Sequence, residues 1–139
     1  MSPRGLGQVT RRVPPRHCDA QGMMHASRPA EYFEDAFLAW LDVACGGYDV
    51  LRAAGVDLVI AETTTRYLVP ARLGEEVTAR ATPTERRRRS ITVRFDLVRG
   101  EGEVLVTART AYVCVGPSGA VALPAALDAA LAGVPNRQP

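Results

Sequence analysis

Residues 30–45 read AEYFEDAFLAWLDVAC, and this stretch decides the fold. Its apolar side chains recur at the spacing of one helix face: Phe33, Ala36, Phe37, Trp40 and Ala44. Pro29 suits the first turn of such a helix, and the glycines at positions 46 and 47 end it. We therefore predict one long helix over residues 30–45, with Ser27 as its N-terminal cap.

The chain on either side of this helix has the pattern of strands. A short extended segment lies within residues 8–16, and β-rich segments cover residues 58–69, 76–82, 91–97 and 104–115. The links between the later segments have the length of hairpin turns, which join antiparallel strands. We predict an α+β fold in which an antiparallel sheet packs against the long helix. Shorter helices are expected at residues 48–54 and 124–131.

Length and composition indicate one globular domain. The chain has 139 residues, of which 47% are hydrophobic and 23% are charged, so it can bury a core. Its formal net charge of +2 is too balanced for a dedicated binder of duplex DNA. No apolar run reaches the roughly 18–20 residues of a membrane helix, and the N-terminus lacks the apolar stretch of a signal peptide. We expect a cytoplasmic protein with a single domain over residues 1–139, a core at about 8–116, and a tail or short helix at 117–139.

Several common catalytic signatures are missing from the sequence. It contains no glycine-rich phosphate loop, no Gly-x-Ser-x-Gly elbow and no His-Glu-x-x-His zinc motif. Its three cysteines, Cys18, Cys45 and Cys114, form no Cys-x-x-Cys pair, so we expect neither a metal site nor a disulfide framework. The histidines are His17 and His25, and acid–base chemistry must therefore use them or carboxylates.

The stretch at residues 17–27, HCDAQGMMHAS, holds the best candidate for chemistry. Asp19 lies in a loop that leads into the start of the long helix. The first N–H groups of a helix are unpaired and partly positive, so they can polarise a carbonyl group or stabilise an oxyanion. Asp19 could then act as a nucleophile or as the base that activates water. The alternative is that Asp19 only stabilises the turn before the helix.

Four segments of the chain resemble those of one known family, in the same order. They are residues 19–22 (DAQG), 32–36 (YFEDA), 67–75 (YLVPARLGE) and 85–90 (ERRRRS). The resemblance spans roughly residues 9–115 and is to the hotdog-fold thioesterases, in particular the Asp-dependent group similar to 4-hydroxybenzoyl-CoA thioesterase. It implies a hotdog fold, in which an antiparallel sheet wraps one central helix. It also implies edge-to-edge dimers, often paired into tetramers, with active sites at the dimer interface.

The resemblance further implies roles for individual residues. Asp19 matches the loop carboxylate that attacks the thioester or activates water. The backbone N–H groups at residues 24–27, that of Ala26 included, match the oxyanion donors at the start of the central helix. Arg87, Arg88 and Arg89 match basic positions near the phosphates of coenzyme A.

Four more residues complete the expected site. We expect Met24 and Tyr67 to contact the substrate. His25 belongs to a His-Ala-Ser triplet similar to one in some bacterial acyl-CoA thioesterases, and it could orient substrate or shuttle a proton. A loop histidine bonded to backbone or solvent is the alternative. Glu62 lies mid-strand and could support catalysis if a companion subunit supplies a partner, although a charge on the solvated face of the sheet explains it as well.

The run of arginines at residues 86–89 has two interpretations. On a strand these residues alternate, so two point each way. Two arginine forks suit a phosphate, or an acidic carrier protein. Charge runs near strand ends are, however, usually solvated.

These observations predict a thioesterase that hydrolyses an acyl- or aryl-CoA, or acyl-carrier-protein, thioester to a free acid and a thiol. Coenzyme A or phosphopantetheine enters as part of the substrate, and no cofactor, metal, nucleic acid or membrane partner is expected. We expect a homodimer or homotetramer, and release of a polyketide chain is a question of substrate within this class. The alternatives are a hotdog hydratase or dehydratase acting on enoyl or 3-hydroxyacyl thioesters, and a non-catalytic binder of acyl thioesters.

Overall fold

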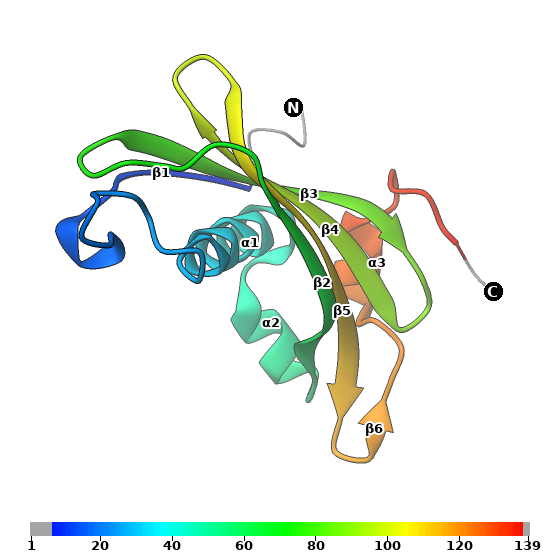
Figure 1. Cartoon of the computed structure of the whole chain (residues 1–139). Coiled ribbons are helices and arrows are strands. Elements are labelled where there is room, and N and C mark those ends of the chain that lie inside the picture. Colours follow the sequence, from blue (N-terminus) through cyan, green and yellow to red (C-terminus); the bar gives the residue numbers. More distant parts are fainter. Residues whose placement is uncertain (1–6, 138–139) are drawn as a thin grey trace.

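The computed structural model describes residues 7–137 and shows an antiparallel sheet lying across one long helix (Figure 1). Its strands are β1 (Gln8–Arg12), β2 (Asp57–Tyr67), β3 (Glu76–Arg86), β4 (Ser90–Arg99), β5 (Glu103–Gly116) and β6 (Gly119–Ala120). Its helices are α1 (Pro29–Cys45), α2 (Tyr48–Ala53) and α3 (Ala125–Ala130), and a 3-10 turn, η2, covers Pro15–His17. The order of the elements is the predicted one: a short strand, the long helix, four strands and a terminal helix.

The main sheet has the strand order β1-β3-β4-β5-β2, and β6 pairs with the end of β5. All pairings between the named strands are antiparallel. The hairpin links predict this for β3–β4 and β4–β5, because residues 87–89 and 100–102 are too short to cross the sheet. Within the described residues, β2 pairs with β5 alone. One edge of β2 is therefore open.

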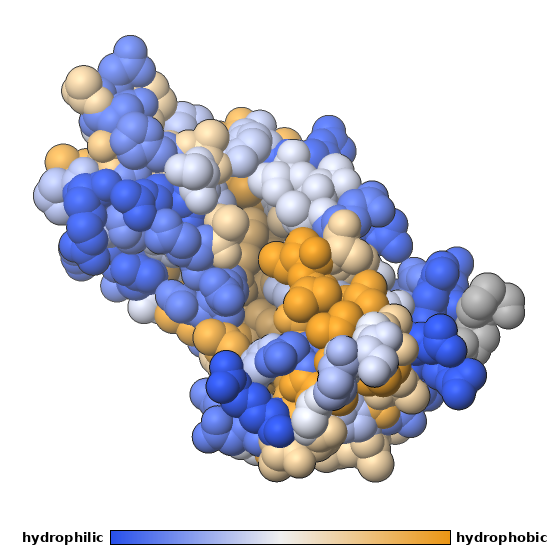
Figure 2. All heavy atoms as spheres, turned by 90° about the horizontal axis from the view of Figure 1, so that it is seen from below, coloured by the Kyte–Doolittle hydropathy of each residue, from blue (hydrophilic) through white to orange (hydrophobic). Residues whose placement is uncertain are grey.

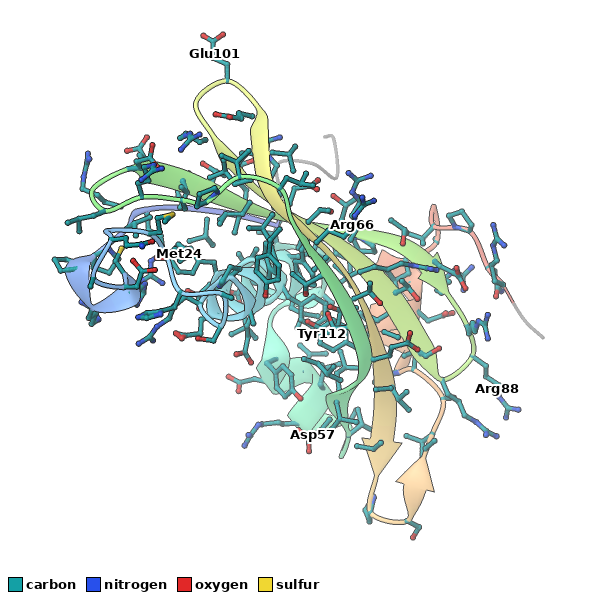
Figure 3. The ribbon with its side chains drawn as sticks, viewed as in Figure 1. Met24, Asp57, Arg66, Arg88, Glu101 and Tyr112 are labelled. Atoms are coloured by element: carbon teal, nitrogen blue, oxygen red, sulfur yellow. The ribbon has the colours of Figure 1, made fainter. Side chains whose placement is uncertain are left out.

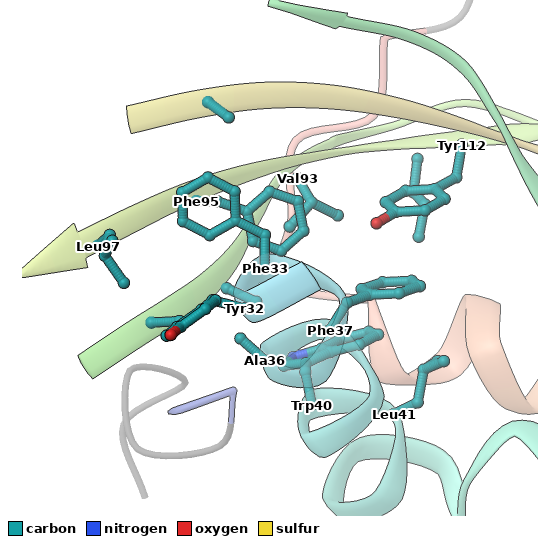
Figure 4. Packing of buried hydrophobic residues seen from close by; sticks show 14 of the residues in the cluster. Tyr32, Phe33, Ala36, Phe37, Trp40, Leu41, Val93, Phe95, Leu97 and Tyr112 are labelled. Carbon is teal, nitrogen blue, oxygen red and sulfur yellow. The ribbon is translucent and has the colours of Figure 1, made fainter. Parts of the chain in front are cut away.

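The inner face of the sheet and one face of α1 form the core (Figure 4). Phe33 of α1 stacks on Phe95 of β4 with ring centroids 5.1 Å apart, and Phe37 stacks on Tyr112 of β5 at 4.3 Å. Trp40 is 3% exposed, so the predicted apolar face of the helix is the buried one. Burial of a large apolar side chain contributes about 1.5–3 kcal/mol, and this face therefore holds α1 against the sheet.

The start of α1 differs from the prediction, whereas its end agrees. Ser27 does not cap the helix, because Arg28 occupies the cap position and makes no side-chain cap hydrogen bond. Arg28 already has helical backbone angles (φ −78°, ψ −32°), whereas a side-chain cap needs an extended residue. A turn closed by the Arg28 N–H and the His25 carbonyl oxygen, 3.0 Å apart, leads into the helix instead. At the other end, Gly46 has a φ of 95°, the left-handed conformation that ends a helix.

β3 is longer than predicted, and the arginine run lies at its end. The strand continues to Arg86 because its register with β4 shifts between Pro83 and Glu85, which accommodates the proline. Residues 87–89 form the turn to β4. The expectation of four arginines alternating along a strand is therefore wrong.

The segment after β5 also contributes to the core. Leu123, Leu127 and Leu131 are buried in the same cluster as the sheet and α1 side chains. The end of the chain pairs with β3 through Arg86, whose N–H donates to the Pro135 oxygen at 2.9 Å. The hydrophobic core therefore extends past residue 116, where we expected it to end.

One structural observation bears on the predicted localisation, namely the length and hydropathy of the helices. None of the helices within residues 7–137 has both the length and the hydropathy needed to cross a bilayer. Residues 1–6, on which the expected lack of a signal segment also rests, lie outside the described residues.

Candidate active site

Asp19 lies at the start of a tight loop whose backbone contacts its carboxylate. Cys18 and Met24 form an isolated antiparallel bridge that closes this loop. The Asp19 Oδ1 atom accepts the N–H groups of Gln21 at 2.8 Å and Met23 at 3.1 Å. The hydrogen bond from Met23 is the largest cause of a lowered pKa of Asp19, although desolvation opposes it. The carboxylate is therefore ionised at neutral pH, and its Oδ2 atom accepts no hydrogen bond from residues 7–137.

Two of the four N–H groups expected as oxyanion donors, those of Met24 and His25, already donate to carbonyl oxygens elsewhere in the chain. The Met24 N–H donates to the Ala71 oxygen at 2.8 Å, and the His25 N–H donates to the His17 oxygen at 2.9 Å. These two groups cannot serve as oxyanion donors. The expected set of donors at residues 24–27 is thus narrowed to Ala26 and Ser27, whose N–H groups have no acceptor among the described residues.

Hydrogen bonds to two carbonyl groups set the direction of these N–H groups. The His25 oxygen accepts the Arg28 N–H, and the Ala26 oxygen accepts the Tyr67 hydroxyl at 2.7 Å. A peptide unit is planar and trans, so its N–H points opposite to its carbonyl oxygen. Fixing the two oxygens therefore fixes the N–H groups of Ala26 and Ser27. Both lie just before the positive end of α1, an arrangement that can stabilise an oxyanion.

Four of the predicted site residues line one pocket beside this helix start. The helix-start pocket has a volume of about 240 Å³, and its walls include Met24, His25, Ala26 and Tyr67. Asp19 lies on the adjacent loop and not on the pocket wall. Figure 3 shows Met24 on this side of the molecule, in the loop that lies against the sheet.

The two histidines have different environments. His17 is 4% exposed, and its Nδ1 atom lies 2.7 Å from the Tyr32 hydroxyl. Burial, with a further contribution from Arg28 and other nearby arginines, lowers the pKa of His17. The side chain of His25 is exposed and borders the helix-start pocket. His25 is therefore the histidine that a substrate can reach.

Glu62 and Arg87 meet in a different pocket, on the face of the sheet that points away from α1. This outer pocket has a volume of about 270 Å³ and also contains Glu85 and Arg109. Glu85 pairs with both arginines at 3.3 Å. Within one chain Glu62 is therefore separated from the helix-start pocket by the sheet. The sequence analysis did not identify Glu85 and Arg109 as pocket residues. The alternation of polar residues along β3 and β5 could have placed both on this outer face of the sheet.

The turn at residues 87–89 presents side chains on a rigid backbone. The Arg87 N–H donates to the Ser90 oxygen, and the Arg89 and Arg88 oxygens accept N–H groups from Cys114 and Leu123, all at 2.8–2.9 Å. The side chains of Arg88 and Arg89 are exposed and pair with no residue in the described part of the chain. This arginine turn can therefore offer its charges to a ligand.

The arginine turn and the Asp19 loop lie at opposite ends of the sheet. The loop pairs with Arg72, shortly before β3 begins, and the turn follows the end of β3. The 11 residues of β3 span about 33 Å, and Figure 3 shows Met24 and Arg88 far apart. One chain therefore does not bring the two predicted parts of the site together. Within residues 7–137, no group of three His, Cys, Asp or Glu side chains is arranged to hold a metal ion.

Comparisons with known proteins identify the family and the fold of this chain. A family model described as the thioesterase superfamily matches residues 21–106, a range that begins just after Asp19 and includes the helix-start pocket and the arginine turn. A hypothetical protein from Thermus thermophilus is 28% identical, with 92% of this chain and 98% of that chain covered and a TM-score of 0.84. A 1,4-dihydroxy-2-naphthoyl-CoA thioesterase from Synechocystis is 19% identical, with 90% and 94% covered and a TM-score of 0.81. A hypothetical protein from Staphylococcus aureus, solved in complex with CoA, is 17% identical, with 94% and 84% covered and a TM-score of 0.85. No curated protein matches the chain. These matches confirm the expected hotdog fold.

Proposed function

This chain belongs to the thioesterase superfamily and is a thioester hydrolase, and we propose that it converts an acyl- or aryl-thioester of coenzyme A or of a carrier protein to a free acid and a thiol at the Asp19 loop. The observation that carries this proposal is the pair of fixed, unpartnered N–H groups of Ala26 and Ser27 beside an ionised carboxylate loop. Thioester cleavage needs both an oxyanion site and a nucleophile or base.

The proposed reaction uses this chain's residues in three roles. The thioester oxygen accepts hydrogen bonds from the Ala26 and Ser27 N–H groups, which stabilise the negative charge that develops on it. Asp19, or a water that it activates, attacks the carbonyl carbon. The C–S bond then breaks, and the leaving sulfur takes up a proton that His25, exposed at the pocket, can supply. Direct attack gives a mixed anhydride, which water hydrolyses to the acid.

The open edge of β2 supports a dimer of this chain. Exposed apolar side chains lie on or just after this strand: Val59, Ile60, Tyr67 and Leu68. An unpaired strand edge readily joins a second strand, and two copies related by a two-fold axis would pair β2 with β2 in antiparallel fashion. The expected tetramer would combine two such dimers.

The same axis would bring the arginine turn of one copy toward the helix-start pocket of the other. Ser90, which follows the turn, pairs with Val113, and Val113 pairs with Val59 near the start of β2. The turn therefore lies two strands, about 10 Å, from that end of β2. In the antiparallel pair this end lies beside the Tyr67 end of the other copy. A thioester bound at one copy could then place its phosphates on the arginines of the second copy, where Glu62 could also contribute.

Coenzyme A and a carrier protein share the chemistry that the arginines would recognise. Both carry a phosphopantetheine arm, and paired arginine forks bind phosphate well. The Staphylococcus aureus neighbour was solved with CoA, which favours coenzyme A as the carrier here. An acidic carrier protein would meet the same charges by surface complementarity.

The test is thiol release from benzoyl-, short-acyl- and long-acyl-CoA and from a carrier-bound acyl chain. We expect hydrolysis of at least one of them by the purified protein. If none is cleaved, hydration of enoyl-CoA is measured next, and turnover there would replace the thioesterase with a hydratase. Binding of a non-hydrolysable acyl-CoA without either reaction would indicate a binder.

A further inference from the structure

A third pocket, between α1 and β2, is not used by the proposed steps. This apolar pocket has a volume of about 520 Å³, within the range of small-molecule sites. Apolar side chains from both elements and from the sheet dominate its wall: Phe33, Phe37, Leu38, Leu58, Ile60 and Tyr112. Figure 2 shows apolar side chains gathered beside a hollow on the face seen from below the sheet.

The apolar pocket begins where the proposed oxyanion site ends. Ala30 and Glu31, in the first turn of α1, belong to its wall. Ser27, which offers one of the two N–H groups, lies three residues before Ala30, in the turn that leads into α1. A thioester whose carbonyl oxygen lies at these N–H groups can therefore extend its acyl group along α1 into the apolar pocket.

One hydroxyl on this wall is accessible from the pocket and has no partner among the described residues. Tyr112 is 7% exposed, its ring stacks on Phe37 at 10°, and its hydroxyl makes no hydrogen bond to any residue in 7–137. Figure 4 shows its hydroxyl pointing toward the side on which Phe33 and Phe95 lie. By contrast, the hydroxyl of Thr110, a wall residue that is 4% exposed, pairs with the Thr63 hydroxyl at 2.8 Å. The Tyr112 hydroxyl is therefore free to donate to a ligand oxygen that enters the pocket, where the apolar wall offers no competing acceptor.

The charge around Tyr112 restricts which oxygen fits. Burial, and then the charge of Glu34, raises the pKa of Tyr112, so the hydroxyl stays protonated and can donate. The carboxylate of Glu34 lies on the pocket wall and disfavours an anionic acyl group, whereas that of Glu31 is paired with Arg28 at 2.9 Å. A neutral hydroxyl or keto oxygen meets both conditions.

We propose that Tyr112 determines substrate specificity by donating a hydrogen bond to a neutral hydroxyl or keto oxygen on the acyl portion of the thioester. The ring stack fixes the donor, and the apolar wall binds the carbon skeleton that carries the oxygen. This assignment rests on the proposed thioesterase function and adds the class of acyl group: an apolar body, aromatic or aliphatic, with one neutral oxygen.

The test compares kcat/KM for substrate pairs that differ by one oxygen. Benzoyl-CoA is paired with 3- and 4-hydroxybenzoyl-CoA, and octanoyl-CoA with 3-hydroxyoctanoyl-CoA, so that aromatic and aliphatic sources are separated. We expect the wild type to prefer the oxygenated member of at least one pair by about 10–100-fold. In Tyr112→Phe, which keeps the stacked ring, this ratio should fall toward one.

Tyr48→Phe is the matched control, since it removes a phenolic hydroxyl from the same pocket wall. The Tyr48 hydroxyl already pairs with Asp57 at 3.1 Å and with the Leu58 N–H at 3.0 Å, so its removal should leave the preference ratio as in the wild type. A wild type that cleaves both members of every pair equally well contradicts the inference, and so does a Tyr112→Phe variant with an unchanged ratio. If Tyr112→Phe does not fold, equal wild-type affinities for the non-hydrolysable thioether analogues of each pair contradict it instead. A lack of hydrolysis of all substrates would contradict the proposed function itself.

Discussion

The Asp19 loop and the arginine turn are both polar connections at ends of the sheet. The loop leaves backbone N–H groups available to a ligand, whereas the turn leaves charged side chains. In the loop, the Asp19 side chain is held by backbone N–H groups, and the Ala26 and Ser27 N–H groups are left for a ligand. In the turn at residues 87–89, three backbone groups (the Arg87 N–H and the Arg88 and Arg89 oxygens) pair within the described part of the chain, and the side chains of Arg88 and Arg89 are left for a ligand.

This difference teaches which step each region can serve. Peptide N–H groups held by other hydrogen bonds have one direction, which suits a charge that develops at one point in the transition state. Long arginine side chains adapt to a ligand and bind it through charge. Changes in the loop should therefore lower kcat, and changes in the arginine turn should raise KM.

The largest effect is expected for Asp19→Asn. The asparagine Oδ1 can still accept the Gln21 and Met23 N–H groups, so the loop should keep its shape while the nucleophile or base is lost. Turnover should fall by about 10³-fold or more, measured as thiol release with the best substrate. Asp49→Asn, which changes an exposed carboxylate on α2, is the control and should have the wild-type rate. A fall of less than tenfold for Asp19→Asn would remove the catalytic role and leave Asp19 as a turn residue.

The pH dependence of kcat/KM is a second test of the catalytic role of Asp19. Asp19 must be ionised to act, and its pKa lies below the ordinary value of 3.8. The active form is therefore fully present at pH 5–8 and is lost only as pH falls through this lowered pKa. A profile of kcat/KM should show no acid limb from Asp19 above about pH 4. A loss of kcat/KM as pH falls from 7 to 5 would have to come from a group other than Asp19 and would contradict Asp19 as the group that limits activity in acid.

Replacement of all three arginines of the turn by serine should have the second largest effect on activity. KM should rise about 10–100-fold with kcat nearly unchanged, and added salt should reduce the difference between variant and wild type. Arg94→Ser removes a charge that is already paired with Asp96 on β4 and serves as the control with an unchanged KM. If the triple variant lost kcat instead, the contrast between the two regions would be wrong.

Tyr67→Phe should have a smaller effect, and it separates two roles for this residue. Without the hydroxyl, the Ala26 carbonyl is no longer held, and the Ser27 N–H loses its fixed direction. We expect kcat to fall about tenfold with little change in KM. A raised KM at constant kcat would instead support the original expectation that Tyr67 contacts the substrate.

The smallest effect concerns stability and the buried His17. Above pH 6.5 this histidine is neutral in both the folded and the unfolded chain, so it adds no pH dependence there. As pH falls below 6.5, the unfolded chain binds a proton that the folded chain resists, because the pKa of His17 is lowered in the fold. Urea unfolding should therefore show lower stability at pH 5.5 than at pH 7.5. His17→Gln should reduce this difference; if the difference stays the same in the variant, another group causes it.

The sequence predicted the architecture well because the architecture depends on local periodicity. The spacing of Phe33, Phe37 and Trp40 identified the buried face of α1, and alternation along residues 91–97 identified β4. Errors came where a single residue was judged alone. Ser27 was expected to cap a helix that begins with a turn, and the strand expected over residues 76–82 continues through Pro83, which a register shift accommodates.

The site could be predicted only in part, since its geometry depends on contacts between distant segments. The sequence pointed to residues 24–27 as oxyanion donors, but Ala71 and His17 occupy two of these N–H groups. No spacing rule indicates that the Tyr67 hydroxyl holds the Ala26 carbonyl. The separation of Asp19 and the arginine turn likewise follows from the length and direction of β3, which place them at opposite ends of one chain.

The central claim is that one site uses the Asp19 loop of one chain and the arginine turn of another. The direct measurement is co-expression of Asp19→Asn with the triple arginine variant under different tags, followed by thiol-release assays of the purified mixed dimer at substrate concentrations far below KM. In a mixed dimer, one site has both an intact loop and an intact turn, so kcat/KM per dimer should recover to about half of the wild-type value. If each chain used its own arginines, no intact site would form, and a mixed dimer with no more activity than half of the triple variant would contradict the account.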